Sequence, residues 1–482
     1  MAASCDTISM LNAVSEDKKR LHFFGGIAGA LLPFLLFIVG VAWIALSGAP
    51  DERGFWPILI LALATGLFLA RDKKQYCEAV IDGMSERLVM IMIVAWTLAS
   101  IIGILMSITG LVEGLSWLAS QANLGGRGMI VASFLICCAV AISTGSSFAT
   151  ILICGPILYP SAGMLGADLP TLAGAILAGA TFGDCIAPIS DTTIAAATSQ
   201  NTDIAGTVLS RLKYVIPVGV VALVAYYFFG SSVAGAVAII APQGSPRGLP
   251  MLLVPILIIY LFLRRKHLMH GLLAGLCFGV ILGLVLGLLS PGQLLSLDLN
   301  NFTAKSFVID GVNRAVGISF FTILLMGLVG ALKASGLLDR LVGFASQHST
   351  TEASGEWWIV GTVSAAVLLT THSVVAILMS GDFANSTGED AQIHPYRRAN
   401  LLSMVVCIFP FLLPYFIPVI LMSNTTVLGP EYNLASVSPI AVGLHNFVAW
   451  GLLAMVLIAV VFGYGRASKK LQGRNDNREL TN

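Results

Sequence analysis

The chain has 482 residues, of which 57% are hydrophobic and only 11% are charged. This composition excludes an ordinary soluble domain and indicates an integral membrane protein with many apolar spans. The formal net charge of +1 does not indicate nucleic-acid binding, because the basic residues form short clusters between apolar runs.

Polar segments stand at both ends of the chain, and we expect them to be cytoplasmic tails, residues 1–20 and 466–482. The apolar run from Phe23 to Leu46 has the length of a full span and lacks a small-residue cleavage site, which predicts a retained first helix. The eight cysteines form no CxxC pair and have no His at ligand spacing. We therefore expect no structural metal, no disulfide framework and no cofactor.

An internal repeat organises the chain. Val80 to Ser120 and Val308 to Ser346 both begin with Val-Ile-Asp-Gly, continue as an apolar span and end with Ala-Ser, at an offset of 226 to 228 residues. The same offset aligns a polar break at Ser143 to Ser147 with Thr370 to Ser373, and Pro188 with Pro414. The predicted halves are residues 21–230 and 250–465, each with two leading helices, and residues 231–249 link them.

The basic clusters predict how the halves are oriented, because Lys and Arg in short loops favour the cytoplasm. The clusters near Arg20, Lys73, Arg265 and Lys469 place the halves in opposite orientations with both termini inside. The same scheme places Arg211 with Lys213, Lys333 with Arg340, and Arg397 with Arg398 on the cytoplasmic side, whereas Arg127 is the main exception.

The predicted fold class is therefore an all-α polytopic membrane protein with two inverted-topology repeats and broken helices. We expect roughly ten to fourteen membrane-embedded helical segments. Residues 128–166 and 357–395 are predicted to be re-entrant hairpins, although two full crossings would satisfy the same orientation.

The segment from Gly179 to Thr198, GATFGDCIAPISDTTIAAAT, places two aspartates and a proline inside an apolar span. A carboxylate at membrane depth costs several kcal/mol, so Asp184 and Asp191 are predicted to handle ions or protons. Pro188 lacks an N–H group and frees the backbone oxygen of Asp184, while Ser190 or Asp191 is a candidate N-cap for the run that follows. The alternative is structural, in which Asp184 pairs with a buried Arg or caps a half-helix and Asp191 is only an N-cap.

Two further breaks are candidate parts of the same site. The hydroxyl run Ser143 to Ser147 is predicted to line the ion path, although small-residue helix packing explains the run equally simply. In the second half Thr371, His372 and Ser373 occupy the matching break, and His372 is either a proton carrier or a structural hydrogen-bonding group. Pro410, Pro414 and Pro418 predict a strongly broken span, and a second register aligns Asn424 with Asp191 instead.

The residues GDCIAPISDTTIAAAT and STGSSFAT resemble the signature segments of NhaC-type sodium/proton antiporters of the ion transporter superfamily, with Phe148 where Trp is usual. The likeness covers most of residues 80–460, but TTHSVVAIL departs from the family pattern. The resemblance implies a homodimer in the plasma (inner) membrane and places these residues in or beside a cation/proton site: Asp184, Ser190, Asp191, Thr192, Thr193, Thr144, Ser146 and Ser147.

Three functions are then open. The first is sodium or lithium exchange for protons by alternating access, in which transported Na⁺ is bound at Asp184 and Asp191 and competes with protons, because both prefer the same dehydrated carboxylates. The second is sodium- or proton-coupled transport of a small amino or organic acid, since family relatives exchange malate and lactate. The third, an intramembrane aspartyl enzyme, is disfavoured because Phe182 replaces the glycine expected two residues before Asp184. We therefore expect a transporter and not an enzyme, in contact with the lipid bilayer.

Overall fold

The computed structural model describes residues 20–46, 52–122, 124–188, 190–230, 245–264, 268–298, 303–337, 351–427, 432 and 434–466. Most of the two predicted tails and of the linker at 231–249 lie outside the described residues. The described chain is helical apart from one short hairpin, so the protein is an all-α polytopic membrane protein. Seven described helices are long and apolar enough to cross a membrane, and four shorter apolar helices accompany them.

The chain divides into two compact units, Met1–Val94 with Val316–Phe344, and Ala95–Ala315 with Ala345–Asn482. These units do not follow the predicted halves, because compactness reflects contacts and not the order of the chain. The helices α5 (Arg87–Ile108) and α15 (Phe307–Ala334) each contribute to both units. The first unit otherwise contains α2 (Ile27–Leu46), η1 (Glu52–Gly54), α3 (Phe55–Leu69) and α4 (Lys73–Met84).

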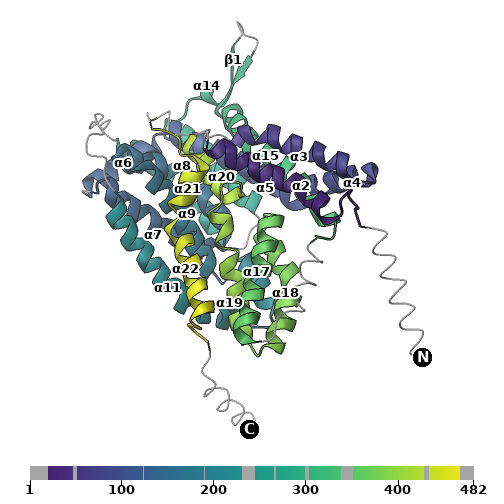
Figure 1. Ribbon diagram of the computed structural model, residues 1–482. Coiled ribbons are helices and arrows are strands. Elements are labelled where there is room, and N and C mark those ends of the chain that lie inside the picture. Colours follow the sequence, from purple (N-terminus) through teal and green to yellow (C-terminus); the bar gives the residue numbers. More distant parts are fainter. Residues whose placement is uncertain are drawn as a thin grey trace, which may run out of the picture. The chain divides into compact units, whose positions relative to one another are not determined.

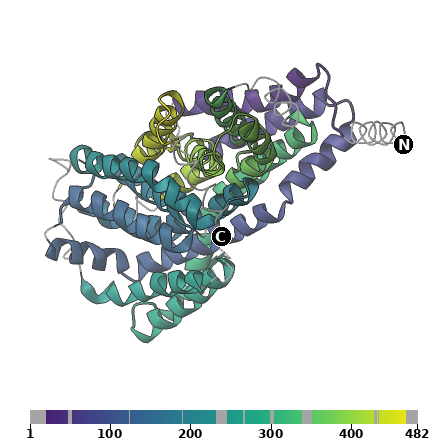
Figure 2. The same cartoon turned by 90° about the horizontal axis from the view of Figure 1, so that it is seen from below.

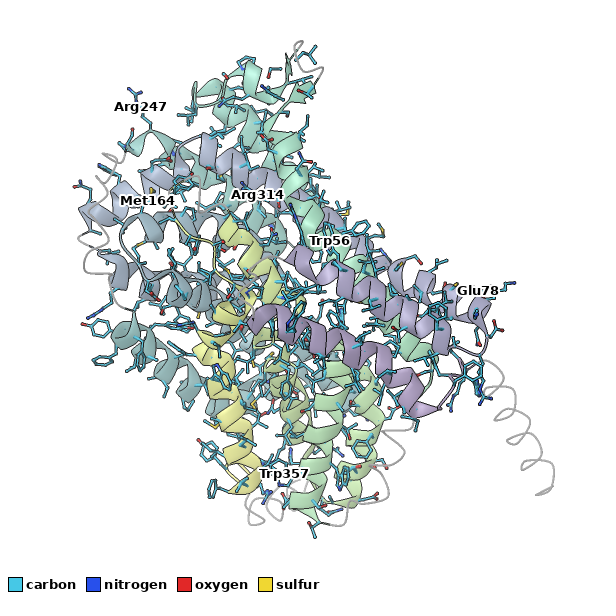
Figure 3. All side chains as sticks on the ribbon, turned by 45° about the horizontal axis from the view of Figure 1, so that its top comes forward. Trp56, Glu78, Met164, Arg247, Arg314 and Trp357 are labelled. Atoms are coloured by element: carbon cyan, nitrogen blue, oxygen red, sulfur yellow. The ribbon has the colours of Figure 1, made fainter. Side chains whose placement is uncertain are left out.

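In the first unit α2 and α3 lie side by side (Figure 1), and aromatic residues of α3 pack on α15. The indole N–H of Trp56, a residue labelled in Figure 3, donates to the carbonyl oxygen of Gly317 at 3.3 Å. Phe55 packs on Phe321 with ring centroids 5.8 Å apart. Gly83 and Gly330 allow α4 to approach α15 closely, because a Cβ on Gly330 would lie 2.5 Å from the carbonyl oxygen of Ala79.

The second unit holds the remaining elements. They are α6 (Leu111–Gln121), α7 (Gly126–Thr144), α8 (Ser147–Met164), α9 (Leu169–Ile186), α10 (Asp191–Ser199), α11 (Ile204–Phe229), η2 (Pro246–Leu252), α12 (Leu253–Leu263), α13 (Leu268–Val285), α14 (Pro291–Leu294), β1 (Ser296–Asp298), β2 (Thr303–Lys305), α17 (Glu352–Thr370), α18 (Ser373–Asp390), α19 (Pro395–Val405), η3 (Phe409–Phe411), α20 (Ile417–Thr425), α21 (Pro439–Leu444) and α22 (Phe447–Val461). The strands β1 and β2 pair antiparallel, with Leu297 opposite Ala304, and the sequence pattern did not predict them.

Eight helices of the second unit form four pairs whose first residues are 226 apart, an offset also found in the sequence repeat. The pairs are α7 and α17, α8 and α18, α9 and α19, and α10 and α20, and the difference between their first residues, for example 373 minus 147, is 226 in each pair. The helices α7 and α17 both have 19 residues, and α8 and α18 both have 18. Opposite orientations in the membrane and the re-entrant form of the hairpins stay predictions.

Close packing of α7 on α9 positions the residues described next (Figures 1 and 2). Gly179 and Gly183 face α7, because a Cβ on Gly179 would lie 2.6 Å from the Cβ of Cys137 and one on Gly183 would lie 2.6 Å from the carbonyl oxygen of Cys138. Glycines four residues apart let helix backbones approach in this way. The end of α9 is thereby held beside the end of α7.

Candidate functional site

Two helix breaks meet at the candidate site. Between α7 and α8 the chain turns at Gly145, whose φ of +66° is the left-handed conformation that glycine adopts without strain. Ser146 then caps α8 by accepting a hydrogen bond from the N–H of Ala149 at 3.2 Å. Between α9 and α10 the chain leaves the helix at Ala187, passes through Pro188 and re-enters a helix after Ser190, which is the break that Pro188 predicted.

Asp184 lies in the last turn of α9 and connects the two breaks. Its side chain is buried, at 8% exposure, and its two carboxylate oxygens accept hydrogen bonds from different elements. Ser147 at the start of α8 donates to Oδ2 at 2.8 Å, and Ser190 donates to Oδ1 at 2.7 Å. The hydroxyls of Ser190 and Thr192 are 2.9 Å apart, which extends the cluster into α10. The structure thus gathers one carboxylate and three hydroxyls, all predicted from the sequence.

The two aspartates have different surroundings. Asp191 is the first residue of α10, and its side chain is exposed and forms no hydrogen bond or ion pair with the part of the chain that the structure describes. Ser190, not Asp191, holds the N-cap position. A negative charge in the first turn of a helix is favourable. The structure therefore brings Asp184 into the hydroxyl cluster and leaves Asp191 at its exposed edge.

The other predicted residues of the first half lie close by with different partners. The Thr144 hydroxyl donates to the carbonyl oxygen of Val140 in its own helix at 2.9 Å. Ser146 is engaged as the cap of α8, and Thr193 is fully buried and accepts a hydrogen bond from Arg211 at 3.0 Å. None of the three bonds to Asp184, so their hydroxyls support the breaks.

The predicted break in the second half has the same form as the first. Thr371 ends α17 with a φ of +53°, and His372 caps α18 by accepting from the N–H of Val375 at 3.4 Å. Ser373 donates to the carbonyl oxygen of Val406 at 3.1 Å, and Asn424 is buried in α20. Pro414 lies between η3 and α20, so this span is broken as its prolines predicted.

Asn446 connects α9, which precedes the break at Pro188, with η3, which precedes the break at Pro414. Its Nδ2 group donates to the Thr181 hydroxyl at 3.2 Å and to the carbonyl oxygen of Phe411 at 3.1 Å. Thr181 lies one turn before Asp184 in α9, and Phe411 ends η3. Asn446 could not be singled out from the sequence, because a lone amide near the start of α22 matches no motif.

Arg211 is the main residue of this region that the sequence interpretation did not single out. The sequence predicted only that it lies on the cytoplasmic side, and the structure places it fully buried in α11. Its Nη1 group donates to the carbonyl oxygen of Cys185 at 2.6 Å and to Thr193, and its Nε group donates to Asn400 of α19 at 3.1 Å. Its Nη2 group has no hydrogen-bond partner among the described residues. The available signal was its position inside the apolar run of α11, of which it is the eighth residue.

Arg397 is also buried, which the sequence did not predict. It lies in α19, where its guanidinium pairs with the fully buried Glu356 of α17. A buried acidic partner allows a basic residue to lie inside the protein.

The comparisons with known proteins match the part of the chain that carries this site. Residues 54–231 match the model of the Na+/H+ antiporter family. That segment, a little over a third of the chain, is similar to the Na+/H+ antiporter family. Asp184, both first-half breaks and Arg211 all lie within it.

Three curated relatives are similar to this chain. The malate-2H(+)/Na(+)-lactate antiporter of Bacillus subtilis is 27% identical over 39% of this chain and 39% of its own length. The Na(+)/H(+) antiporter NhaC of the same organism is 27% identical over 46% and 48%, and that of Alkalihalophilus pseudofirmus is 29% identical over 43% and 46%. The chain spans about half the length of the curated relatives it matches, or less.

A solved structure, that of the efflux pump MtrF from Neisseria gonorrhoeae, matches at 13% identity and a TM-score of 0.39, covering 89% of this chain and 94% of that chain. At that TM-score, the match assigns no element of this chain.

Proposed function

We propose that this protein exchanges sodium or lithium ions for protons across the plasma membrane by alternating access. The observation that carries the proposal is the placement of Asp184, a buried carboxylate held between two helix breaks by the hydroxyls of Ser147 and Ser190. Buried carboxylates at broken helices are typical of transported-ion sites. In this proposal both termini lie on the cytoplasmic side, which is the side that the basic clusters favour.

The donor set suits a small hard cation. Sodium and lithium prefer carboxylate, hydroxyl and carbonyl oxygens, and the cluster offers Asp184 with the hydroxyls of Ser147, Ser190 and Thr192. Among the described residues no three His, Cys, Asp or Glu side chains come together as a metal site. The cation would therefore depend on Asp184 as its one charged ligand.

Exchange follows from the competition for that carboxylate. In a desolvated site Asp184 is favoured in a neutral state, either protonated or paired with a metal ion. The ion and the proton cannot both occupy it, so loading one releases the other. We assign to Asp191, exposed at the start of α10, the attraction of cations to the break and not their binding.

The test is sodium-driven proton movement in proteoliposomes that carry an imposed pH gradient and a trapped pH dye. Addition of sodium should collapse the gradient for the wild type, and Asp184→Asn should abolish the response. Asp191→Asn should raise the sodium KM and keep coupled exchange. Asp382→Asn, which changes an exposed aspartate of α18, is the matched control and should behave as the wild type. Undiminished exchange by Asp184→Asn would exclude the proposal.

A second candidate function, exchange of a small organic acid coupled to sodium or protons, is favoured by Arg211. Its buried Nη2 group has no partner among the described residues, and a carboxylate is the ligand that a guanidinium pairs with best. The same liposomes should then respond to malate or lactate, and Arg211→Gln should lose that response while sodium alone still moves protons. A wild type that responds to sodium but to neither malate nor lactate would leave only the first function.

A further inference from the structure

A cavity of about 120 Å³ opens within the first compact unit, and no residue of the proposed ion site lines it. Its polar lining consists of Arg20, His22, Arg71 and Ser335, and no acidic side chain is among the described residues that line it. Its apolar lining includes Phe23, Ile27 and Ala30. Two guanidinium groups and an imidazole around one cavity favour an anion.

Backbone hydrogen bonds connect the segments that line this cavity and that carry its basic side chains. The N–H of Arg71 donates to the carbonyl oxygen of His22 at 2.9 Å, and the N–H of Phe24 donates to that of Leu69 at 2.8 Å. The N–H of Leu21 donates to the carbonyl oxygen of Ala334 at 2.9 Å, which ties the end of α15 to the same wall. Arg20 and Arg71 are thus brought to one cavity by the main chain, although like charges repel.

Apolar side chains also line this cavity and its smaller neighbour. A smaller cavity of about 10 Å³ shares Phe23 and Ala30 with the first and is lined further by residues such as Phe34 and Leu328. Along α2 the side chains of Leu35, Val39 and Trp43 are exposed, and their spacing of four residues puts them on one helix face. In a membrane this face meets acyl chains.

We propose that the cavity binds the headgroup phosphate of an anionic phospholipid, whose acyl chains lie along the exposed face of α2. Arginine pairs with phosphate through two parallel N–H groups, which suits Arg20 and Arg71 at the cavity mouth. A free phosphate would bind the two arginines but would not contact the apolar residues that line the cavity. The basic clusters that contain Arg20 and Arg71 predict a cytoplasmic location, and basic pockets between helices on that side bind anionic lipids.

The experiment measures the melting temperature of the purified full chain in a neutral detergent with added phosphatidylglycerol or phosphatidylcholine. Phosphatidylglycerol should raise the melting temperature of the wild type by a few degrees more than phosphatidylcholine. The variant with Arg20→Gln and Arg71→Gln should lose that difference. Arg247→Gln is the control, because Arg247 is exposed in the second unit and its side chain projects from the surface (Figure 3), and it should keep the difference.

A second pair of variants leaves both arginines intact. Ile27 lines the cavity with 46% of its side chain exposed, so a polar residue there should not disturb packing. Ile27→Glu should abolish the effect of phosphatidylglycerol by repelling the phosphate, whereas Ile27→Gln should keep most of it. Lipid retained on the protein, counted by native mass spectrometry, should follow the same order.

Two outcomes would overturn the proposal. One is an equal phosphatidylglycerol effect in the wild type and in the double arginine variant. The other is equal stabilisation by inorganic phosphate or glycerol phosphate, which would make the cavity a site for a soluble anion and not for a lipid.

Discussion

Ser147 is the residue that connects the α7–α8 break to Asp184, and its hydroxyl is the most direct target for mutation. A hydrogen bond to a charged group contributes about 1.5–3 kcal/mol, and Ser147→Ala removes one from Asp184 Oδ2. If the hydroxyl also serves the bound cation, the sodium KM should rise by about tenfold or more. Sodium titration of the proteoliposome exchange rate measures this change.

Ser143→Ala provides the control for Ser147→Ala. The Ser143 hydroxyl donates to the carbonyl oxygen of Ala139 in its own helix at 2.7 Å, four residues earlier and outside the Asp184 cluster. Its removal should leave the sodium KM within a factor of two of the wild type, roughly the spread expected of a surface change. Equal changes in both variants would contradict a specific role for Ser147.

The sequence predicted much of the site at this scale, and the reason for each success or failure is physical. Asp184, Ser147 and Ser190 were found because a carboxylate or a hydroxyl run inside an apolar span is costly and conspicuous. Arg211 was not singled out because the positive-inside rule explains a basic residue on the cytoplasmic side without a buried role. The exposure of Asp191 could not be predicted, because the direction of its side chain depends on how the chain turns between Ala187 and Ser190.

At the scale of helices, the contact of α7 with α9 depends on glycine. A Cβ on Gly183 would overlap the Cβ of Ala141 and lie 2.6 Å from the carbonyl oxygen of Cys138. Backbone cannot move away as a flexible side chain can, so Gly183→Ala should cost about 1–3 kcal/mol and lower the melting temperature. Exchange activity should fall as well, because Asp184 is the next residue.

Gly361→Ala is the matched control for the helix contact. Gly361 lies in the middle of α17, and a Cβ there would have no heavy atom within 4 Å. Alanine in an open helix position stabilises by up to about 1 kcal/mol relative to glycine, so the melting temperature should stay or rise. A loss of stability in both variants would mean that helix packing at Gly183 is not the cause.

The repeat stays a prediction at this scale. Four pairs of helices begin 226 residues apart, the offset at which Pro188 aligns with Pro414. The helix α17 begins at Glu352, because its polar first turn is helical despite its charges. The short strands β1 and β2 were not predicted, since three-residue strands leave too little pattern.

At the scale of the whole second unit, Asp203 connects the start of α11 with the start of α19, two segments that are far apart in sequence. Its Oδ1 atom accepts a hydrogen bond from the Tyr396 hydroxyl, and its Oδ2 atom accepts from the N–H of Gly206 at 2.6 Å. These bonds, that from Tyr396 first, hold the pKa of Asp203 below its ordinary value. A lowered folded-state pKa contributes stability above the ordinary aspartate pKa, and this is lost as pH falls through the folded-state value.

Tyr396→Phe should therefore lower the melting temperature at neutral pH and differ less from the wild type below about pH 4. The ring keeps its stacking on His394, which separates the hydroxyl from the packing. Melting curves of both proteins in detergent between neutral and acidic pH measure the effect. A difference that stays constant down to the lowest pH would rule out the ionised Asp203 as its source.

The largest buried charge cluster of the second unit is centred on Glu356, in the second turn of α17. Its fully buried carboxylate accepts hydrogen bonds from Arg397 of α19 and, at 2.7 Å, from Arg466, which follows α22. Arg397 also donates to the Tyr214 hydroxyl of α11 at 2.9 Å. One carboxylate thus connects four parts of the chain that are far apart in sequence.

Glu356→Gln would leave the two arginines without their buried negative partner, and breaking such a pair from one side costs about 3–5 kcal/mol. Glu352→Gln is the matched control, because Glu352 lies one turn earlier on the same helix, 3.7 Å from the same Arg466, but is 40% exposed. An exposed ion pair contributes about 1 kcal/mol or less. Denaturation midpoints in detergent should therefore fall strongly for Glu356→Gln and little for Glu352→Gln. Replacing Glu356 and Arg397 together by Gln and Met should restore part of the loss, and equal midpoints for the two single variants would show that burial of Glu356 does not govern the stability of this unit.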